Sequence, residues 1–323
     1  MPVPLPSRSV LFLGVSTGAS AVHRVFPGWM AALGLSAGLE GVDLPLGADP
    51  SAYRAFVERI RGDEAILGAV VTSHKAGVFA ACALLFDDVS ADARMLHEVA
   101  GISRRDERLR ADAPDVRSVA RAAARLLEDR RWTAGCHDAV ILGAGGAGLC
   151  LAYALAHGSP AHGSPAHGSP PDGAPSLGVR GIVLTEADPT RLSVVETIVG
   201  AWRHADAVRV EPATRDVNDR LVRGAGPGAL IVNATGRGKD RPGSPLSAAA
   251  FPHEGIVWDF NYRGELDFLR QARAQATERD LLVSDGRDYL VAGWMEALCF
   301  VTGRDAGDDL LARFETAARA VGI

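Results

Sequence analysis

A run of glycines placed directly after an apolar segment most constrains what this chain can fold into. Residues 139–142 are four consecutive apolar residues, and residues 143–148 read GAGGAG. Leucine and alanine then recur at helical spacing from Leu149 to Leu155. Strand, glycine turn and helix in this order are the context in which G-x-G-x-x-G predicts a dinucleotide site. A plain glycine turn is the alternative interpretation.

The glycines have separate expected roles. Gly143 allows the tight turn, Gly145 lets backbone N–H groups approach a pyrophosphate, and Gly148 lets the helix pack closely on the strand. The N-terminus of that helix would face the phosphates. The residues expected to carry the pyrophosphate are Gly143, Ala144, Gly145, Gly146 and Ala147.

An acidic residue about 20 positions after the glycines is expected to bind the adenosine ribose. The next predicted strand, 180–185, ends at Glu186, and Asp188 follows. Without the 15 residues of a threefold AHGSP repeat, Glu186 lies 23 residues after Gly148. A carboxylate here would repel a 2′-phosphate, so the sequence favours NAD, while Arg191 keeps NADP possible. The alternative for Glu186 is a solvated turn residue.

The repeat itself, within residues 156–177, has a composition that cannot bury a core. We interpret it as a solvated surface insertion. Its histidines, His157, His162 and His167, could bind a metal weakly, but we expect no metal site.

Strands and helices alternate through both halves of the chain, which predicts an α/β fold. The expected strands are 9–14, 42–44, 66–72, 98–103, 139–142, 180–185, 207–210, 230–232, 255–260 and 281–284. The expected helices are 23–33, 50–62, 76–86, 116–128, 149–155, 190–203, 290–301 and one from about 308. A turn at 105–107 and a polar stretch ending at 114–115 connect the halves.

Polar residues at predicted strand ends are the candidates for chemistry, because ligands bind at that edge of an open α/β sheet. Lys75 follows a buried strand and could donate or accept a proton, with Asp115 as its partner. A surface lysine and a simple helix cap are the alternatives for these two residues. Other polar candidates at strand ends are Ser16, Thr17, Ser20, His23, Thr72 and His74.

Charge and composition exclude several classes of protein. The net charge of −5 provides no basic surface for nucleic acid or anionic membranes. No apolar run approaches the roughly 20 residues that span a bilayer. The four cysteines show no C-x-x-C spacing, which indicates a reducing compartment, and we expect a cytoplasmic protein.

Taken together, the ordered motifs resemble those of the shikimate/quinate dehydrogenase family over almost the full chain. The family's G-x-N-V-T-x-P-x-K corresponds to 68–75, one residue shorter, and places its catalytic lysine on Lys75. Its N-T-D-x-x-G places the partner aspartate on Asp115. The remaining matches are the glycine loop at 143–148, N-A-T at 233–235, D-x-x-Y at 259–262 and the C-terminal D-G-x-x-M-L-V-x-Q-A at 285–294.

The resemblance implies an N-terminal α/β substrate domain, a C-terminal Rossmann-type NAD(P) domain and a cleft between them. We expect the substrate domain at 1–115, completed by the C-terminal helices of 288–323, and the NAD(P) domain at 116–287. Asn233, Thr235 and Gly236 would line the nicotinamide side of the cofactor site. Thr17, Ser20, Thr72 and Tyr262 would contact the substrate.

Departures from the family pattern fall in the substrate motifs. The family's S-x-S-P-x-x-H-N is replaced by residues 17–24, TGASAVHR, and its C-terminal glutamine falls on Gly293. A diverged paralogue acting on a different small cyclic substrate is therefore the first hypothesis. An NAD-binding sensor without catalysis, and a genuine shikimate or quinate dehydrogenase, are the alternatives. The expected oligomeric state is a monomer or homodimer.

Overall fold

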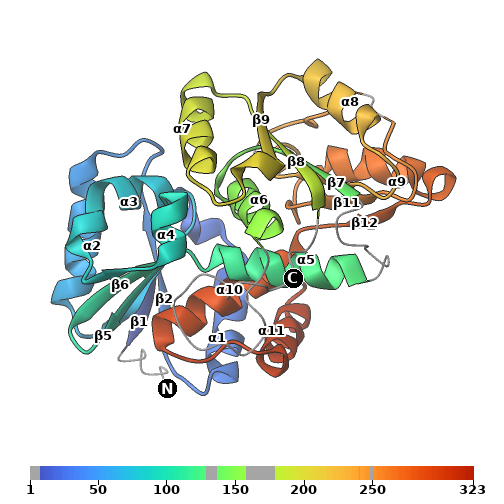
Figure 1. Ribbon diagram of the computed structural model, residues 1–323. Helices are drawn as coiled ribbons and strands as arrows, with labels where there is room; N and C mark the ends of the chain where they lie inside the picture. The colour runs from blue at the N-terminus through green and yellow to red at the C-terminus, as the bar shows by residue number, and fades with distance from the viewer. Residues whose placement is uncertain (1–7, 129–136, 158–178, 240, 248–249) are drawn as a thin grey trace. The chain divides into compact units, whose positions relative to one another are not determined.

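The computed structural model describes residues 8–128, 137–157, 179–239, 241–247 and 250–323. The chain forms two compact units, each built around a six-stranded sheet (Figure 1). The first unit comprises 8–118 and 291–323, and the second comprises the described residues between 119 and 290. The α/β fold class is confirmed. The repeat beyond His157, with His162 and His167, and Cys136 lie outside the described residues.

The sheet of the first unit has the strand order β2-β1-β3-β5-β6-β4. Its strands β1, β2 and β3 are parallel, whereas β5 runs antiparallel to β3 and to β6. The carboxyl ends of the three parallel strands therefore meet at one edge. The strands are β1 (Ser9–Gly14), β2 (Gly38–Asp43), β3 (Ile66–Val71), β4 (Asp88–Val89), β5 (Gly101–Arg105) and β6 (Arg108–Asp112).

Helices connect these strands, and their starts show recognisable capping. At the start of α2 the Asp49 side chain accepts a hydrogen bond from the Ser51 N–H, and Pro50 occupies the first helical turn, as predicted. The elements are α1 (Val22–Ala32), α2 (Pro50–Gly62), α3 (Lys75–Cys82), α4 (Ala91–Leu96), α5 (Asp115–Glu128), α10 (Arg287–Thr302), α11 (Asp308–Ala320) and the 3₁₀ turns η1 (Thr17–Ala19) and η2 (Ala83–Leu85).

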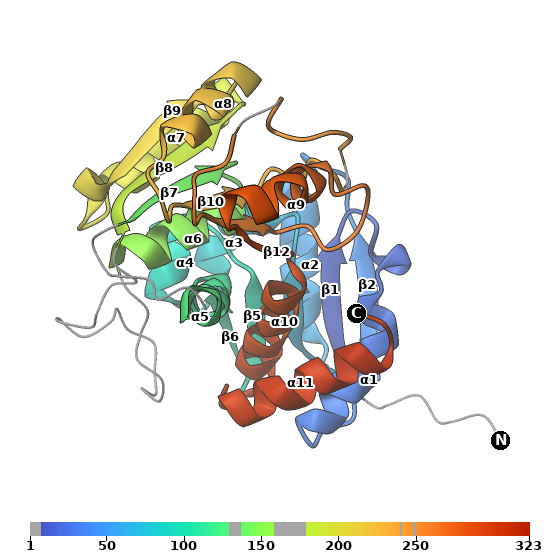
Figure 2. The ribbon, with the colours of Figure 1, turned by 90° about the vertical axis from the view of Figure 1, so that its right-hand side faces the viewer.

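The C-terminal helices supply part of the core of the first unit. Trp29 of α1 stacks on Phe314 of α11 with ring centroids 5.4 Å apart, and its indole N–H donates to the Phe314 carbonyl. Trp294 of α10 stacks on Trp29 and meets Phe12 of β1 edge-on. Figure 2 shows α11 lying beside α1. Residues almost 300 positions apart are thus packed into one apolar cluster.

The sheet of the second unit is entirely parallel, with the order β12-β11-β10-β7-β8-β9. The order reverses between β7 and β10, which is where ligands bind in doubly wound folds. The strands are β7 (His137–Leu142), β8 (Val179–Glu186), β9 (Val208–Pro212), β10 (Leu230–Asn233), β11 (Ile256–Asp259) and β12 (Leu282–Ser284). The helices are α6 (Gly146–His157), α7 (Pro189–Gly200), α8 (Arg215–Gly224), α9 (Asp267–Arg279) and the 3₁₀ turn η3 (Ala205–Ala207).

Several sequence-based assignments in the first unit need correction. The strand expected at 98–103 is β5, which begins at Gly101, and the sequence predicted neither β4 nor α4. The strand expected at 42–44 is β2, which begins four residues earlier, at Gly38. The polar stretch expected after residue 107 contains strand β6, whose Leu109 and Ala111 are buried. Left-handed backbone at Asp106 and Glu107 makes the tight turn that joins β5 to β6.

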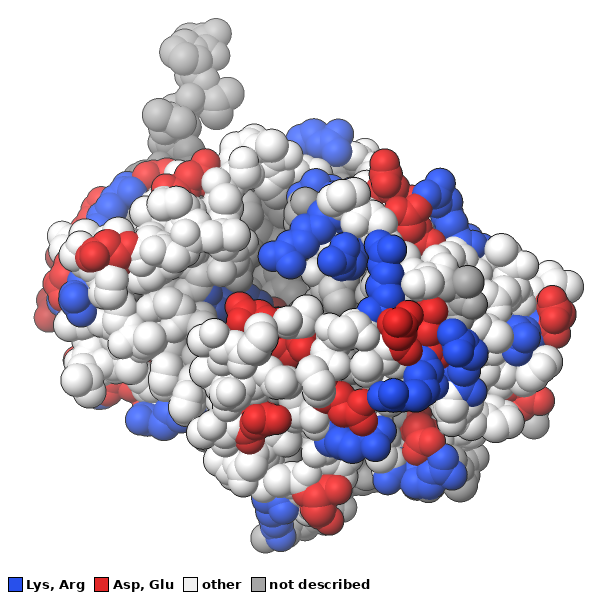
Figure 3. All heavy atoms as spheres, turned by 90° about the horizontal axis from the view of Figure 1, so that it is seen from above, with Lys and Arg blue, Asp and Glu red and all other residues white. Residues whose placement is uncertain are grey.

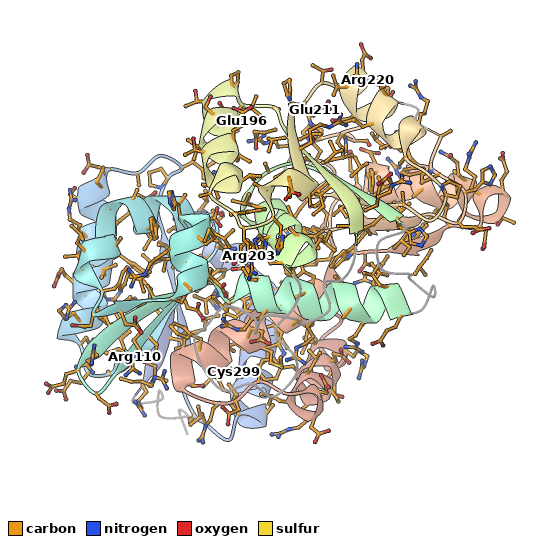
Figure 4. All side chains as sticks on the ribbon, viewed as in Figure 1. Arg110, Glu196, Arg203, Glu211, Arg220 and Cys299 are labelled. Atoms are coloured by element: carbon orange, nitrogen blue, oxygen red, sulfur yellow. The ribbon has the colours of Figure 1, made fainter. Side chains whose placement is uncertain are left out.

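The surface carries charges of both signs. Acidic and basic side chains are interspersed over the face in Figure 3. In the second unit, Glu211 of β9 lies 3.7 Å from Arg220 of α8, and both are labelled in Figure 4. Among the described residues, no helix is both long and apolar enough to cross a membrane.

Replacing Phe314 with Ala is expected to lower the free energy of unfolding by about 3–5 kcal/mol, because Phe314 is fully buried against Trp29. Urea denaturation followed by tryptophan fluorescence measures the loss. Thr316→Ala, at an exposed position of the same helix, is the control and should change stability by less than about 0.5 kcal/mol. Equal effects of the two substitutions would show that α11 is not part of this core.

Candidate functional site

Lys75 and Asp115 form an ion pair at the carboxyl edge of the first sheet. The Lys75 Nζ lies 2.9 Å from Asp115 Oδ1, and the side chains are 15% and 18% exposed. Lys75 begins α3, shortly after β3, and Asp115 begins α5. A carboxylate is favoured in the first turn of a helix, and the partial burial strengthens the pairing relative to a surface ion pair. The two residues predicted to work together are therefore adjacent, and their catalytic role remains a prediction.

His74 fixes the segment that carries Lys75. Its Nε2 lies 3.2 Å from the Gly14 carbonyl and 3.0 Å from the Leu44 carbonyl, so this nitrogen carries the proton. Its Nδ1 lies 3.0 Å from the Tyr53 hydroxyl. Burial raises the pKa of Tyr53, so its hydroxyl stays protonated and donates a hydrogen bond to Nδ1. His74 thus joins the ends of β1 and β2 to α2. The sequence marked His74 only as one polar candidate, because none of these partners is its neighbour in the chain.

Thr17 and Thr72 lie close together in this edge, but their hydroxyls already have acceptors. Both side chains approach Gly14, where an added Cβ would lie 2.9 Å from Thr17 Cγ2 and 3.2 Å from Thr72 Oγ1. The Thr72 hydroxyl donates to the Leu13 carbonyl at 3.0 Å. The buried Thr17 donates both its backbone N–H and its hydroxyl to Asp43 Oδ1, at 2.7 Å each. These bonds hold the pKa of Asp43 below its usual value.

The other two predicted substrate contacts are placed differently. The Ser20 Oγ accepts a 3.3 Å hydrogen bond from the Val22 N–H at the start of α1, which is a capping role. Tyr262 belongs to the second unit, with the Lys239 ammonium 5.6 Å from its ring centroid. The substrate roles of Ser20 and Tyr262 stay predictions. Gly293, where the family has glutamine, lies near the Ser118 hydroxyl, which an added Cβ would meet at 3.9 Å.

The glycine loop of the second unit requires glycine at two of its positions. Gly143 has a φ of +102°, and an added Cβ would lie 2.9 Å from the Ala234 carbonyl and from the Thr235 nitrogen. A Cβ on Gly148 would collide with the Gly143 carbonyl, so α6 can pack on β7 only with glycine there. Gly145 faces open space, and the first turn of α6 carries no acidic side chain. Backbone N–H groups at this helix start can therefore approach an anion.

Beside the loop, Asn233 organises the ends of β10 and β11. Its Oδ1 accepts from the Thr235 N–H and hydroxyl, and its Nδ2 donates to Asp259 Oδ1 at 3.1 Å. Asn261 donates its backbone N–H to the same oxygen and its side-chain amide to the Arg237 carbonyl. Burial, followed by the charge of Asp285, raises the pKa of Asp259 to about 7. Gly236, with a φ of +72°, turns the chain within this segment.

The predicted ribose-binding residues also have structural roles. Glu186 closes β8, and its Oε1 accepts the N–H groups of Ala187 and Asp188. Asp188 caps α7, accepting from Thr190 and Arg191. Both carboxylates thus accept local backbone hydrogen bonds, and their ribose-binding roles stay predictions. The Arg191 guanidinium donates twice to the Ala144 carbonyl, at 3.0 and 2.9 Å, and lies 3.7 Å from Glu186. Arg191 thus ties α7 to the glycine loop, a link that spacing in the sequence does not reveal.

A partly buried charge cluster surrounds Arg117, two residues after Asp115 on α5. Arg117 contacts three carboxylates: Asp112 at 2.6 Å, Glu296 at 3.4 Å and Asp92 at 3.8 Å. Burial raises the pKa of Asp92 to about 6, and the charge of Asp112 acts in the same direction. Despite its burial, Arg117 has a raised pKa because the carboxylates hold its charge. Among the residues that the structure describes, no group of three or more histidine, cysteine or acidic side chains could hold a metal ion.

These features define a two-unit α/β protein whose second unit has a Rossmann-type fold. Among solved structures, shikimate 5-dehydrogenase from Thermus thermophilus, in complex with NADP(H) and shikimate, is 25% identical. It has a TM-score of 0.67, with 97% of this chain and 99% of that chain covered. The predicted resemblance to the shikimate/quinate dehydrogenase family is thereby confirmed.

More distant structures share the fold. Quinate dehydrogenase from Corynebacterium glutamicum, in complex with NAD, is 20% identical, with a TM-score of 0.69 and coverage of 97% and 99%. An Ael1 enzyme from Pseudomonas putida is 17% identical, with a TM-score of 0.67 and coverage of 95% and 98%. No protein-family model matches the chain, and no curated protein matches it either.

The raised pKa of Asp259 predicts a dependence of stability on pH. In the unfolded chain this carboxyl titrates near 3.8, whereas in the folded protein it titrates near 7. The folded state therefore binds the extra proton between about pH 4 and 7, so its stability falls as the pH rises through that window. Asp259→Asn carries no titrating group and lacks this loss.

Urea denaturation of both proteins from pH 4.5 to 8 tests the prediction. The stability of the variant relative to the original protein should rise by roughly 2–4 kcal/mol across the window. Other titrating groups, such as Asp92, are common to both proteins and cancel in the difference. A difference that does not change with pH would contradict a protonated Asp259.

Proposed function

We propose that the chain is an NAD(P)-dependent oxidoreductase of the shikimate dehydrogenase type. Its reaction is reversible hydride transfer between a nicotinamide and an alcohol or ketone carbon of a small, cyclic, hydroxylated substrate. The observation that carries this proposal is the 2.9 Å Lys75–Asp115 pair at the strand edge, in a chain whose other unit holds a glycine loop fitted to a dinucleotide. The 25% identical neighbour crystallised with NADP(H) and shikimate supports it.

In this proposal Lys75 moves the proton. During reduction its ammonium donates a proton to the ketone oxygen as that oxygen gains charge, and during oxidation the neutral amine accepts the hydroxyl proton. Asp115 holds the Nζ in place and stabilises its charge at the start of α3, where the helix dipole opposes a cation. Asp115 also accepts a hydrogen bond from a neighbouring substrate hydroxyl. The dinucleotide, when bound, supplies or accepts the hydride.

Different residues are proposed to hold each part of the dinucleotide. The backbone of 143–147 and the start of α6 bind the pyrophosphate, and Asn233, Thr235 and Gly236 border the nicotinamide. Glu186 accepts hydrogen bonds from the adenosine ribose, and its charge disfavours a 2′-phosphate, which favours NAD. The cytoplasmic location and the monomeric or homodimeric state stay predictions from the sequence.

A second candidate is an NAD-binding regulator that has lost catalysis. The observation that favours it is the engagement of the Thr17 and Thr72 hydroxyls by Asp43 and Leu13. A panel of cyclic polyols and hydroxy acids separates the two functions. Production of NADH from any of them supports the enzyme, whereas dinucleotide binding with no turnover supports the regulator.

Lys75→Ala is expected to lower turnover by roughly 10²–10⁴-fold without changing the dissociation constant for NAD, because Lys75 and the glycine loop belong to different units. Lys75→Arg is the matched variant: it keeps a cation beside Asp115, but a guanidinium does not give up its proton. Both variants should be nearly inactive, as measured by NADH absorbance. Full activity of either one would remove Lys75 from the proton-transfer step.

Glu186→Ala is expected to reduce the preference for NAD over NADP by about tenfold, since one carboxylate near the 2′-phosphate is removed while Arg191 remains. Dissociation constants for both dinucleotides provide the measurement. Glu196→Ala, at an exposed position of α7 labelled in Figure 4, is the control and should leave the ratio unchanged. An unchanged ratio in Glu186→Ala would favour the interpretation of Glu186 as a turn residue.

A further inference from the structure

Asp43 occupies hydrogen-bond donors that a ligand would otherwise meet at the carboxyl edge of the first sheet. The backbone N–H and the hydroxyl of Thr17 converge on one carboxylate oxygen, at 2.7 Å each. Thr17 opens η1 just after β1, and Asp43 ends β2, the neighbouring parallel strand. Two donors converging on one point form the kind of arrangement that binds an anion. Here the chain supplies the anion itself.

The position of Thr17 links this contact to the proposed reaction site. Thr17 lies against Gly14 together with Thr72, and Thr72 precedes Lys75 by three residues. The His74 ring bonds the carbonyls of Gly14, the last residue of β1, and of Leu44, the residue after β2. The segments at the ends of β1 and β2 that carry Thr17 and Asp43 are therefore also bonded to His74, the residue before Lys75.

The packing around Thr17 keeps its hydroxyl in this contact. An added Cβ on Gly41 would lie 3.1 Å from the Thr17 Cβ and would collide with the Thr17 hydroxyl, so β2 passes directly beside this side chain. The His23 Nε2 lies 3.2 Å from the Thr17 carbonyl and is also near Gly41. Thr17 is 4% exposed, whereas Asp43 is exposed. The two Thr17 donors are thus fixed on Asp43 Oδ1, while the Asp43 residue itself is exposed.

The charge of Asp43 disfavours an anionic ligand at Thr17. Asp43 is the carboxylate that contacts Thr17, and the ring beside Thr17 is that of His23, whose Nε2 lies 3.2 Å from the Thr17 carbonyl. The bonds from Thr17 lower the pKa of Asp43, so its negative charge persists at neutral pH. The nearby Lys75 charge is paired with Asp115. A substrate carboxylate placed here would lose the Thr17 donors and face the negative charge of Asp43.

We propose that Asp43 determines substrate specificity by excluding a carboxylate from the loop at Thr17, so that the substrate is an alcohol or ketone with an uncharged group at this end. This inference rests on the proposed dehydrogenase function. The exposed Val15 and Leu46, at 42% and 69%, border the same loops and favour a less polar ligand than a polyhydroxy acid.

The experiment measures equilibrium binding of shikimate and of its uncharged methyl ester to the full chain without dinucleotide. The original protein should bind the ester at least about tenfold more tightly than the acid, and the difference should shrink at high salt. Asp43→Asn removes the charge but keeps an acceptor for Thr17, and Asp43→Ala also releases the Thr17 donors. Affinity for shikimate should rise about tenfold in the first variant and further in the second, with ester binding within about twofold.

Asp49→Asn is the matched control, since Asp49 is likewise exposed, accepts a local backbone hydrogen bond and has a lowered pKa, but does not touch Thr17. It should leave both affinities unchanged. Thermal unfolding checks that each variant is folded. The proposal is overturned if Asp43→Asn and Asp43→Ala bind shikimate no more tightly than the original protein does. The same holds if neither the original protein nor any variant binds shikimate.

Hydride transfer is measured separately with NAD and the same two compounds. Ester-selective binding without NADH formation retains the specificity role of Asp43 and contradicts the proposed dehydrogenase function for these compounds. NADH formation with equal use of acid and ester retains the function and overturns the role of Asp43. The two failures are therefore distinguishable.

Discussion

The arrangement of the first unit depends on the contact between the half-buried Arg117 and three carboxylates, of which Asp112 and Glu296 are buried. These carboxylates come from β6, α4 and α10, so one guanidinium on α5 joins four elements. A buried charge is costly unless it is paired, and a partner left alone is strongly destabilising. The cluster therefore specifies where α5 begins. Since Asp115 lies two residues before Arg117, the same contact fixes the carboxylate that holds Lys75.

The second unit depends on a different constraint, the absence of side chains at two glycines. The Gly143 turn and the close contact of Gly148 with its carbonyl bring the start of α6 onto the end of β7. Arg191 then ties α7 to the loop through Ala144, and Asn233 orders the segment on the other side. Local chain geometry and a few charged contacts thus prepare an anion-binding helix start at the switch point of the sheet.

Most of this fold could be predicted from the sequence because buried parallel strands produce continuous apolar runs, such as residues 139–142. Strand β6 was missed because the stretch is rich in charged residues, although RLRAD alternates charged with apolar or small residues, which is the pattern of a half-buried strand. The Lys75–Asp115 pair was predictable from strand ends and motif order. The bond between Thr17 and Asp43 was not, because its partners are 26 residues apart and either could equally be a solvated loop residue.

The contact between Trp29 and Phe314 has a consequence for how the chain is made. The core of the first unit joins residues near both ends of the chain, whereas the described residues of the second unit all lie between them in sequence. During synthesis the early strands emerge long before α11, and Trp29 cannot stack on Phe314 until then. The inserted unit can complete its core first, and the unit that begins first is the last to close.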